Sequence, residues 1–198
     1  MRILGGIFKG RDLPTLEGDG CRPAMAKVRE ALFNMLAARG LALEGARVID
    51  VFAGTGSLGF ESLSRGAAFV QFVEANKALA RRIGENARRL GISQDKYAAA
   101  PADALKLLAR PPREPFHLAF VDPPYGRELM APVLQLLARK GWLAPDALVV
   151  AEVEKALETT TWPASLELET DRLYGQTRIL IWTHPNTVPP STPEPSTL

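Results

Sequence analysis

The chain of 198 residues is poor in cysteine and histidine. Its single cysteine, Cys21, excludes an intramolecular disulfide and a cysteine metal cluster. His117 and His184 lie far apart without the spacing of a metal site, so we expect no metal. No stretch reaches the roughly 20 apolar residues of a membrane span, and no signal peptide is recognisable. We therefore expect a cytoplasmic protein that does not associate with membranes.

An excess of charge of one sign is also missing, because the formal net charge is only +2. That value is too small to indicate a nucleic-acid partner by itself. The charge is distributed unevenly, however, since residues 1–40 carry seven Lys and Arg against four Asp and Glu. A basic segment on a nearly neutral body fits a phosphate-binding surface, and it is equally compatible with a solvated extension.

Apolar runs alternate with helical patterns from residue 47 onward, which indicates a parallel sheet built from βαβ units. The last two runs follow each other without a long helix, so they should pair antiparallel. We therefore predict an α/β fold, a Rossmann-like seven-stranded sheet that is mostly parallel with an antiparallel terminal strand and helices on both faces. Strands are expected over 47–52, 68–73, 97–100, 116–121, 147–152, 166–174 and 176–182, and helices over 25–39, 57–65, 76–90, 102–108 and 128–139.

Three segments are predicted from this pattern. Residues 1–40 form an extension with a small glycine-punctuated β-hairpin and a helix, and residues 41–184 form the main domain. Residues 185–198 contain five prolines and almost nothing apolar, so we expect a disordered tail.

A glycine-rich turn follows the first expected strand. Gly54, Gly56 and Gly59 let the backbone approach a ligand closely and present N–H groups at a helix N-terminus. Glu74 ends the next strand, twenty residues after Gly54. This spacing also fits a dinucleotide fingerprint, in which an acidic side chain holds ribose hydroxyls.

Acidic residues stand at the ends of four successive strands, namely Asp50, Glu74, Asp103 and Asp122. A dinucleotide fold expects an apolar residue at Asp50, whereas a carboxylate there can meet a cationic amino-acid moiety such as that of S-adenosylmethionine. Asp103 can accept from an adenine amine beside the backbone N–H of Ala104, or it can cap its own helix. Each acid alone is more often a cap or a solvated charge, but four together favour a ligand site.

The sequence Asp122-Pro123-Pro124-Tyr125 follows the fourth expected strand, at the sheet edge where ligands bind in open α/β folds. The prolines have no N–H and an ionised Asp122 is purely an acceptor, so this segment offers hydrogen-bond acceptors only. Such a group suits the exocyclic amine of a nucleobase, and Tyr125 offers a face for stacking. A polar turn with a packed tyrosine is the simpler alternative.

These motifs resemble those of class I S-adenosylmethionine-dependent methyltransferases, in which Asp-Pro-Pro-Tyr matches the motif of enzymes that methylate exocyclic amines. More narrowly, residues 2 to about 183 resemble the bacterial RsmD family, the 16S ribosomal RNA guanine-N2 methyltransferases. The motifs that carry this resemblance, in their order along the chain, are Arg2-Ile-x-Gly-Gly, Lys9-Gly10-Arg11, Arg22-Pro23, Val28-Arg29-Glu30-Ala31-Leu32-Phe33-Asn34, Phe52-Ala53-Gly54-Thr55-Gly56, Leu63-Ser64-Arg65-Gly66-Ala67, Val121-Asp122-Pro123-Pro124-Tyr125 and Tyr174-Gly175.

The resemblance implies methylation of a guanine N2 amine in 16S ribosomal RNA, with S-adenosylmethionine as cofactor. The expected partner is 16S ribosomal RNA, either free or within an assembling 30S subunit, and we expect the protein itself to be a monomer. The expected catalytic residues are Asp122, Pro123, Pro124 and Tyr125. The expected cofactor-binding residues are Asp50, Phe52, Ala53, Gly54, Gly56, Leu58, Glu74, Asp103, Ala104 and Asp122. The expected RNA-binding residues are Arg2, Lys9, Arg11, Arg22, Lys27 and Tyr125, with Arg29 beside Lys27 on the same helix.

One departure from the family concerns the residues after Arg22-Pro23. The family usually continues with Thr-x-Asp-Arg, whereas this chain has Ala24-Met25-Ala26-Lys27 and keeps only the cation. Three other functions remain open. An N6-adenine methyltransferase acting on DNA or RNA could use the same Asp-Pro-Pro-Tyr geometry. A nicotinamide-dependent dehydrogenase fits the glycine turn but gives that segment no task, and a non-catalytic RNA-binding protein leaves the four acids unexplained.

Overall fold

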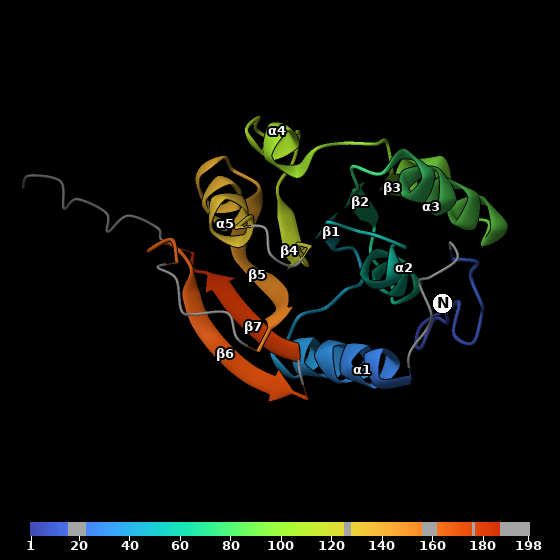
Figure 1. Ribbon diagram of the computed structural model, residues 1–198, viewed down its shortest axis with the longest axis horizontal. Coiled ribbons are helices and arrows are strands. Elements are labelled where there is room, and N and C mark those ends of the chain that lie inside the picture. The colour runs from blue at the N-terminus through green and yellow to red at the C-terminus, as the bar shows by residue number, and fades with distance from the viewer. Residues whose placement is uncertain (16–22, 125–127, 156–161, 176, 187–198) are drawn as a thin grey trace, which may run out of the picture.

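Seven strands form one sheet in the order β3-β2-β1-β4-β5-β7-β6 (Figure 1). The strands are β1 (Arg47–Val51), β2 (Phe69–Val73), β3 (Tyr97–Ala98), β4 (Phe116–Val121), β5 (Leu143–Glu154), β6 (Glu167–Tyr174) and β7 (Thr177–His184). The first five strands run parallel to one another, while β7 is antiparallel to both β5 and β6. The predicted sheet is therefore confirmed. The computed structural model describes residues 1–15, 23–124, 128–155, 162–175 and 177–186.

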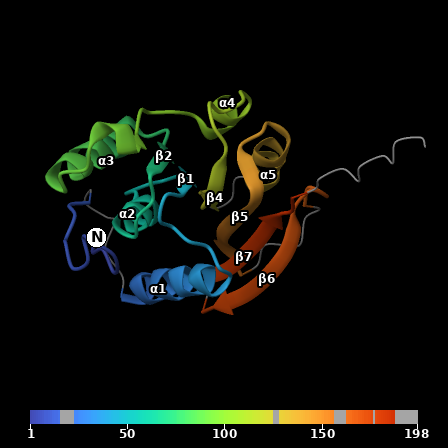
Figure 2. The same cartoon turned by 180° about the vertical axis from the view of Figure 1, so that it is seen from behind.

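Helices cover both faces of this sheet, as the two opposite views show (Figures 1 and 2). The helices are α1 (Pro23–Ala38), α2 (Ser57–Ser64), α3 (Lys77–Arg89), α4 (Ala104–Leu108) and α5 (Met130–Arg139), with a 3₁₀ turn over Gln94–Lys96. Buried residues of α4 and α5 pack in one hydrophobic cluster, and those of α1, α2 and α3 pack in the other. None of the helices in the described ranges is long and apolar enough to cross a membrane.

The central strands β1 and β4 each contribute buried apolar residues to both clusters. On β1, Val48 belongs to the cluster under α1, α2 and α3, while Ile49 and Val51 belong to the cluster under α4 and α5. This alternation follows from the two-residue period of a strand. It also determines which side chains at the strand ends share a face with one another.

Several boundaries differ from the sequence expectation by a few residues, and the starts of β5 and α4 have clear physical reasons. Strand β5 begins at Leu143 rather than at 147, and its pairing with β4 changes register between Phe116 and Leu118. Asp146 has a φ of 58°, so the strand deviates there and resumes beyond it. Helix α4 begins at Ala104 because Asp103 is its N-cap, whose side chain accepts from the Lys106 N–H.

The first thirteen residues fold back on themselves and pack on the rest of the molecule. Arg2 and Asp12 form one antiparallel β-bridge, and the Ile3 N–H donates to the Arg11 carbonyl at 3.0 Å. The expected hairpin is thus reduced to a single bridge with a long turn. Ile3 and Leu13 are buried in the same cluster as α1 and β1, so this loop shares the core of the sheet domain.

Candidate active site

Three strand ends bring acidic side chains to the same edge and the same face of the sheet. Val48, Phe72 and Phe120 all belong to the cluster under α1, α2 and α3. Residues two positions further along each strand point to the same face, because side chains alternate. These residues are Asp50, Glu74 and Asp122. The strand order β2-β1-β4 therefore sets three of the four predicted acids side by side.

Asp50 is buried, with 2% of its surface exposed, and its carboxylate stabilises the glycine turn that follows β1. Its Oδ2 accepts from the Gly59 backbone N–H at 3.0 Å, which ties the strand to the first turn of α2. Burial raises the pKa of Asp50 to about 7, the Gly59 hydrogen bond opposes this, and the Asp122 and Glu74 carboxylates raise it further. Asp50 is therefore part of the acidic edge and also a structural anchor of the glycine turn.

Glu74 holds the glycine turn from the neighbouring strand. One carboxylate oxygen accepts from the Gly54 N–H at 2.9 Å, and the other accepts from the Asn76 N–H at 2.7 Å. Phe52, between Asp50 and Gly54, has a φ of 65°, a conformation that costs a non-glycine residue about 1–2 kcal/mol. Packing of the Phe52 ring against the core cluster accompanies this strained backbone.

The three glycines of the turn have different tasks. A Cβ at Gly59 would lie 2.2 Å from the Phe72 ring, and one at Gly56 would lie 3.0 Å from the Phe60 ring, so both are required for helix α2 to pack on β2. A Cβ at Gly54 would meet no protein atom closer than the Phe52 carbonyl oxygen at 4.0 Å. Of these three glycines, Gly54 alone borders open space.

The other predicted cofactor residues surround this turn or its neighbour. Ala53 is buried and its N–H donates to the Val73 carbonyl, while Leu58 is half-buried against the core. Asp103 is exposed and caps α4, and Ala104 behind it is buried. A parallel bridge between Glu74 and Pro101 holds the Asp103 loop beside β2.

Asp122 continues strand β4 by one residue, because its N–H donates to the Val51 carbonyl at 3.3 Å. Asp122 is exposed at the rim of the sheet, although its carboxyl group lies close enough to neighbouring protein atoms to be partly desolvated. Desolvation, with the Glu152 carboxylate as the second cause, raises the pKa of Asp122 to about 7. Pro123 and Pro124 follow at the rim, and Tyr125 lies outside the described residues.

Glu152 is a residue of this edge that the sequence prediction missed. It lies on β5, next to Asp122, because Val121 pairs with Ala151 in the parallel register. Burial raises its pKa, and a hydrogen bond from the Thr177 side chain opposes this rise. The sequence did contain a signal, since Glu152 ends the expected strand 147–152 just as Asp122 follows the expected strand 116–121.

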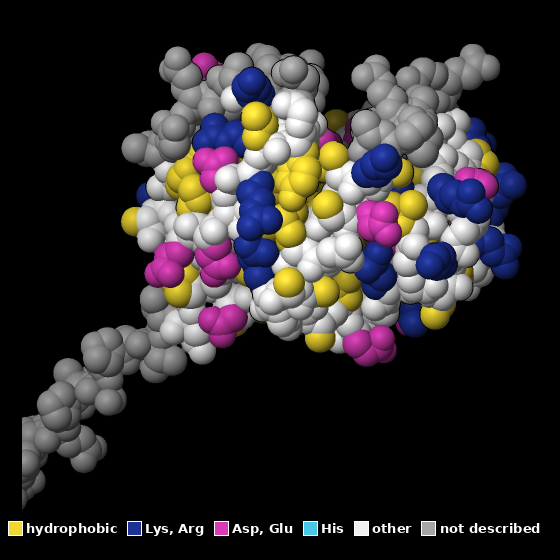
Figure 3. Space-filling model, turned by 90° about the horizontal axis from the view of Figure 1, so that it is seen from below, with side chains coloured by type: hydrophobic (Ala, Val, Ile, Leu, Met, Phe, Trp, Pro, Cys, Tyr) yellow, Lys and Arg dark blue, Asp and Glu magenta, His cyan; other side chains and the backbone are white. Residues whose placement is uncertain are grey.

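The predicted RNA-binding residues that the structure describes are all exposed, namely Arg2, Lys9, Arg11 and Lys27. Figure 3 shows many Lys and Arg side chains on the face seen from below. Some form a row beside hydrophobic side chains left of the centre of the view, and others gather at its right-hand side. Arg22 lies outside the described residues. Arg29 differs from the expectation that it lies beside Lys27 on the RNA-binding face. Only 9% of the residue is exposed, and its guanidinium donates to the Arg2 carbonyl at 2.6 Å, so it supports the backbone of the N-terminal loop.

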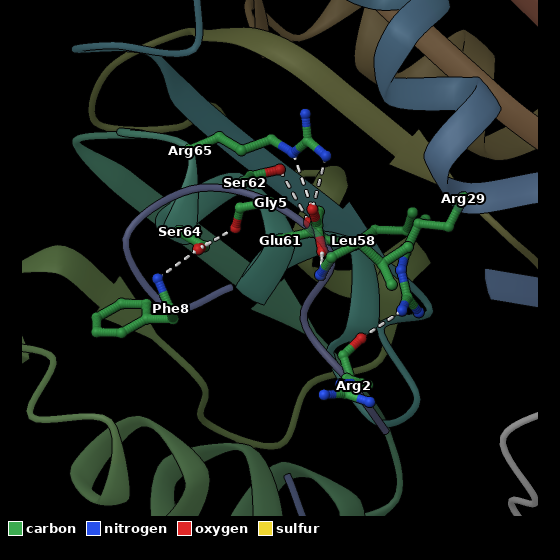
Figure 4. A network of polar contacts seen from close by, with 10 residues as sticks. Arg2, Gly5, Phe8, Arg29, Leu58, Glu61, Ser62, Ser64 and Arg65 are labelled. Atoms are coloured by element: carbon green, nitrogen blue, oxygen red, sulfur yellow. Dashed lines mark hydrogen bonds and ion pairs between the residues drawn. The ribbon is translucent and has the colours of Figure 1, made fainter. Parts of the chain in front are cut away.

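A network of polar contacts fixes the N-terminal loop of residues 1–13, which we call the basic loop, to α2 (Figure 4). Glu61 accepts from the Leu4 N–H and from the Arg65 guanidinium, each at 2.8 Å. Ser64 donates to the Gly5 carbonyl, and its hydroxyl accepts from the Phe8 N–H. These contacts therefore hold the backbone that carries the exposed cations of the loop in one position.

Close backbone contact completes this bracing. The Ile7 N–H donates to the Ser64 carbonyl at 2.7 Å. A Cβ at Gly6 would overlap that carbonyl oxygen at 1.7 Å, and the φ of Gly6 is positive at 74°. Only glycine permits this approach. The motifs around Gly6 and Ser64, distant in sequence, thus form one contact.

Comparison with known proteins gives three likenesses over most of the chain. Residues 1–183 match the family model described as conserved hypothetical protein 95. The ribosomal RNA small subunit methyltransferase D of Haemophilus influenzae is 38% identical over 156 residues, covering 78% of this chain and 79% of that protein. The protein of the same name from Escherichia coli K12 is 36% identical over 176 residues, covering 89% and 86%.

A solved structure agrees with these sequence matches. The Escherichia coli protein yhhF superposes with a TM-score of 0.84 at 34% identity, covering 93% of this chain and 98% of that chain. A mostly parallel seven-stranded sheet, a glycine turn and acidic strand ends define a methyltransferase with a Rossmann-like fold. The chain belongs to the family of ribosomal RNA small subunit methyltransferase D.

Proposed function

We propose that this protein transfers a methyl group from S-adenosylmethionine to the exocyclic N2 amine of a guanine in 16S ribosomal RNA. The observation that carries the proposal is the donor-free end of β4, where the Asp122 carboxylate is followed by two prolines. Family membership supports the RNA substrate, since relatives named small subunit methyltransferases match most of the chain. An amine with two N–H donors is the substrate group that this edge suits.

The glycine turn has room and acidic side chains that fit S-adenosylmethionine. A Cβ at Gly54 would have no protein atom closer than 4.0 Å, so the backbone of the turn leaves room there for a ligand to approach. Glu74 contacts the Gly54 N–H, and we expect its carboxylate to accept from ribose hydroxyls, the Asp103 carboxylate to accept from an adenine amine, and the buried Asp50 to face an ammonium group. When bound, S-adenosylmethionine supplies an electrophilic methyl group on a sulfonium sulfur.

Asp122 is the residue that we expect to position the substrate amine and to accept its proton. Its carboxylate and the Pro123 carbonyl each accept one hydrogen of the amine, which localises the nitrogen lone pair and directs it toward the methyl group. Positioning and fixed acceptors of this kind lower the barrier of an in-line displacement. As the nitrogen gains positive charge, Asp122 is the nearest group to take its proton. The base must leave any stack or pair to reach this edge.

The decisive experiment measures which nucleoside is methylated. Purified protein and labelled S-adenosylmethionine are incubated with 16S ribosomal RNA, with small ribosomal subunits and with DNA, and the digested product is identified by mass spectrometry. We expect N2-methylguanosine from one of the two ribosomal substrates. N6-methyladenosine would establish the alternative function, and no transfer to any substrate would contradict the proposal.

The exposed cations of the N-terminal loop should set the salt dependence of RNA binding. Changing Arg2, Lys9 and Arg11 to Gln together should weaken binding and reduce the slope of log K against log salt by about 2–3, since each phosphate contact contributes about 0.7–0.9. A filter-binding series from low to moderate salt measures this slope.

The matched control changes three exposed arginines of α3 to Gln, namely Arg81, Arg88 and Arg89. We expect these to behave as a solvated face and to leave the slope nearly unchanged. Equal slopes for the two triple variants would show that the loop has no special role in binding RNA.

A further inference from the structure

We infer that Glu152 selects guanine in this site, by accepting the hydrogen on ring atom N1 while Asp122 accepts from the neighbouring exocyclic amine. The inference rests on the proposed function and deepens it, because it names the residue that distinguishes guanine from other bases with an exocyclic amine. It assigns a task to a half-buried carboxylate that the transfer step itself does not need.

The register of the sheet places the two carboxylates together. Val121 pairs with Ala151, so Asp122 and Glu152 are the next residues on adjacent parallel strands, which lie about 4.8 Å apart. Phe120 and Val150 belong to the same core cluster, so the residues two positions later share that face of the sheet. Both side chains therefore border one place at the carboxyl edge.

The surroundings of Glu152 leave it able to accept a further hydrogen bond. The Thr177 hydroxyl donates to one part of the carboxylate, and a carboxylate has about four lone-pair sites. No Lys or Arg forms an ion pair with Glu152 within the part of the chain that the structure describes. Two neighbouring carboxylates without a cation repel each other, and a ligand that donates to both would offset this cost.

The hydrogen-bonding edges of the bases decide which ligand fits. Guanine presents its N2 amine next to the N1–H, so two donors face two carboxylates. Adenine and cytosine also carry an exocyclic amine, but the adjacent ring nitrogen bears a lone pair instead of a hydrogen. An ionised Glu152 would repel that lone pair, and a buried acceptor left without its donor is costly. The pair of carboxylates is complementary to guanine alone among these three bases.

The test uses 2-aminopurine, which keeps the exocyclic amine of guanine but has no hydrogen on N1. After the nucleotide methylated by the wild-type enzyme has been mapped, the same RNA is assembled with guanine or 2-aminopurine at that position. The wild-type enzyme should prefer guanine in kcat/KM by about 100-fold or more, since sites built to bind a donor reject analogues that lack it.

The informative variant is Glu152→Gln, whose amide can accept from guanine N1–H or donate to the lone pair of 2-aminopurine. We expect the preference for guanine to fall to within about 10-fold, with unchanged affinity for S-adenosylmethionine. The lost O6 of 2-aminopurine affects both enzymes alike, so the change in preference isolates Glu152. The control is Glu114→Gln, which removes an exposed carboxylate just before the opposite end of β4.

Two results would overturn the inference. One is an unchanged preference for guanine in Glu152→Gln, and the other is an equal change in Glu114→Gln. If Glu152→Gln does not fold, Thr177→Val removes the hydroxyl that holds Glu152 and should lower the preference partially, so no reduction there contradicts the inference. Failure of the proposed function is recognised separately, because the wild-type enzyme would then yield a product other than N2-methylguanosine.

Discussion

Replacing Asp122 with Ala should lower kcat by about 10³-fold, within the range seen when a positioned acid–base group is lost. The affinity for S-adenosylmethionine should change little, because Asp122 directly follows β4, whereas the glycine turn belongs to the segment after β1. Single-turnover methylation measures the first quantity and calorimetric titration measures the second.

The control for this substitution is Asp122→Asn, which keeps one acceptor oxygen of the same size and position. We expect a smaller loss of kcat, because the amide carbonyl can still accept from the substrate amine. An equal loss of cofactor affinity and turnover in Asp122→Ala would assign the residue to the cofactor instead.

The same residue should set the pH dependence of the reaction. Asp122 must be ionised to accept from the amine, and its pKa is raised to about 7 by desolvation and then by Glu152. The rate should therefore fall as the pH drops below 7 and level off above it. Glu152→Gln removes one cause of the raised pKa, so its acid limb should move to lower pH. A flat rate between pH 5.5 and 8.5 would contradict a role for the Asp122 carboxylate.

Replacing Glu61 with Ala should destabilise the protein by about 2–3 kcal/mol, because the Leu4 N–H and the half-buried Arg65 guanidinium both lose an ionised acceptor. The Glu61 side chain is 1% exposed and carries the Arg65 guanidinium and the Leu4 N–H, so its loss leaves both groups without this acceptor (Figure 4). Urea unfolding at neutral pH measures the change in free energy. The basic loop should also loosen, and RNA affinity should fall.

Glu85→Ala is the matched control for this substitution. Glu85 pairs with Arg81 and Arg82 on the surface of α3, where ion pairs contribute at most about 1 kcal/mol. Comparable destabilisation by the two substitutions would show that the Glu61 network does not brace the loop. A large loss of stability in Glu61→Ala with unchanged RNA affinity would contradict the prediction that this network positions the basic loop for RNA binding.

Much of the fold followed from local patterns in the sequence. Apolar runs separated by helical segments determined a mostly parallel sheet, and the missing helix between residues 174 and 177 determined the antiparallel β7. Because parallel strands end at one edge, the acidic residues of four successive strands are expected to lie together, and the structure sets three of them, Asp50, Glu74 and Asp122, side by side.

Other features depended on contacts between segments distant in the chain. Arg29 reads as a surface cation of a helix, but the fold sets it behind the Arg2 carbonyl, since the N-terminal loop packs over α1. The spacing of Gly56 and Gly59 predicts a close backbone approach to a ligand, and the structure adds that their missing side chains make room for Phe60 and Phe72. Helical periodicity gives the face of a residue but not the segment that will cover it.

The sequence by itself determined which residues could meet at the carboxyl edge, because alternation and strand direction are local properties of the chain. Only the tertiary structure decided that β5 lies directly beside β4 and that Glu152 therefore stands next to Asp122. Strand order is set by how helices and strands pack over a common core, and no local pattern encodes it. The neighbour of Asp122 is a consequence of that packing.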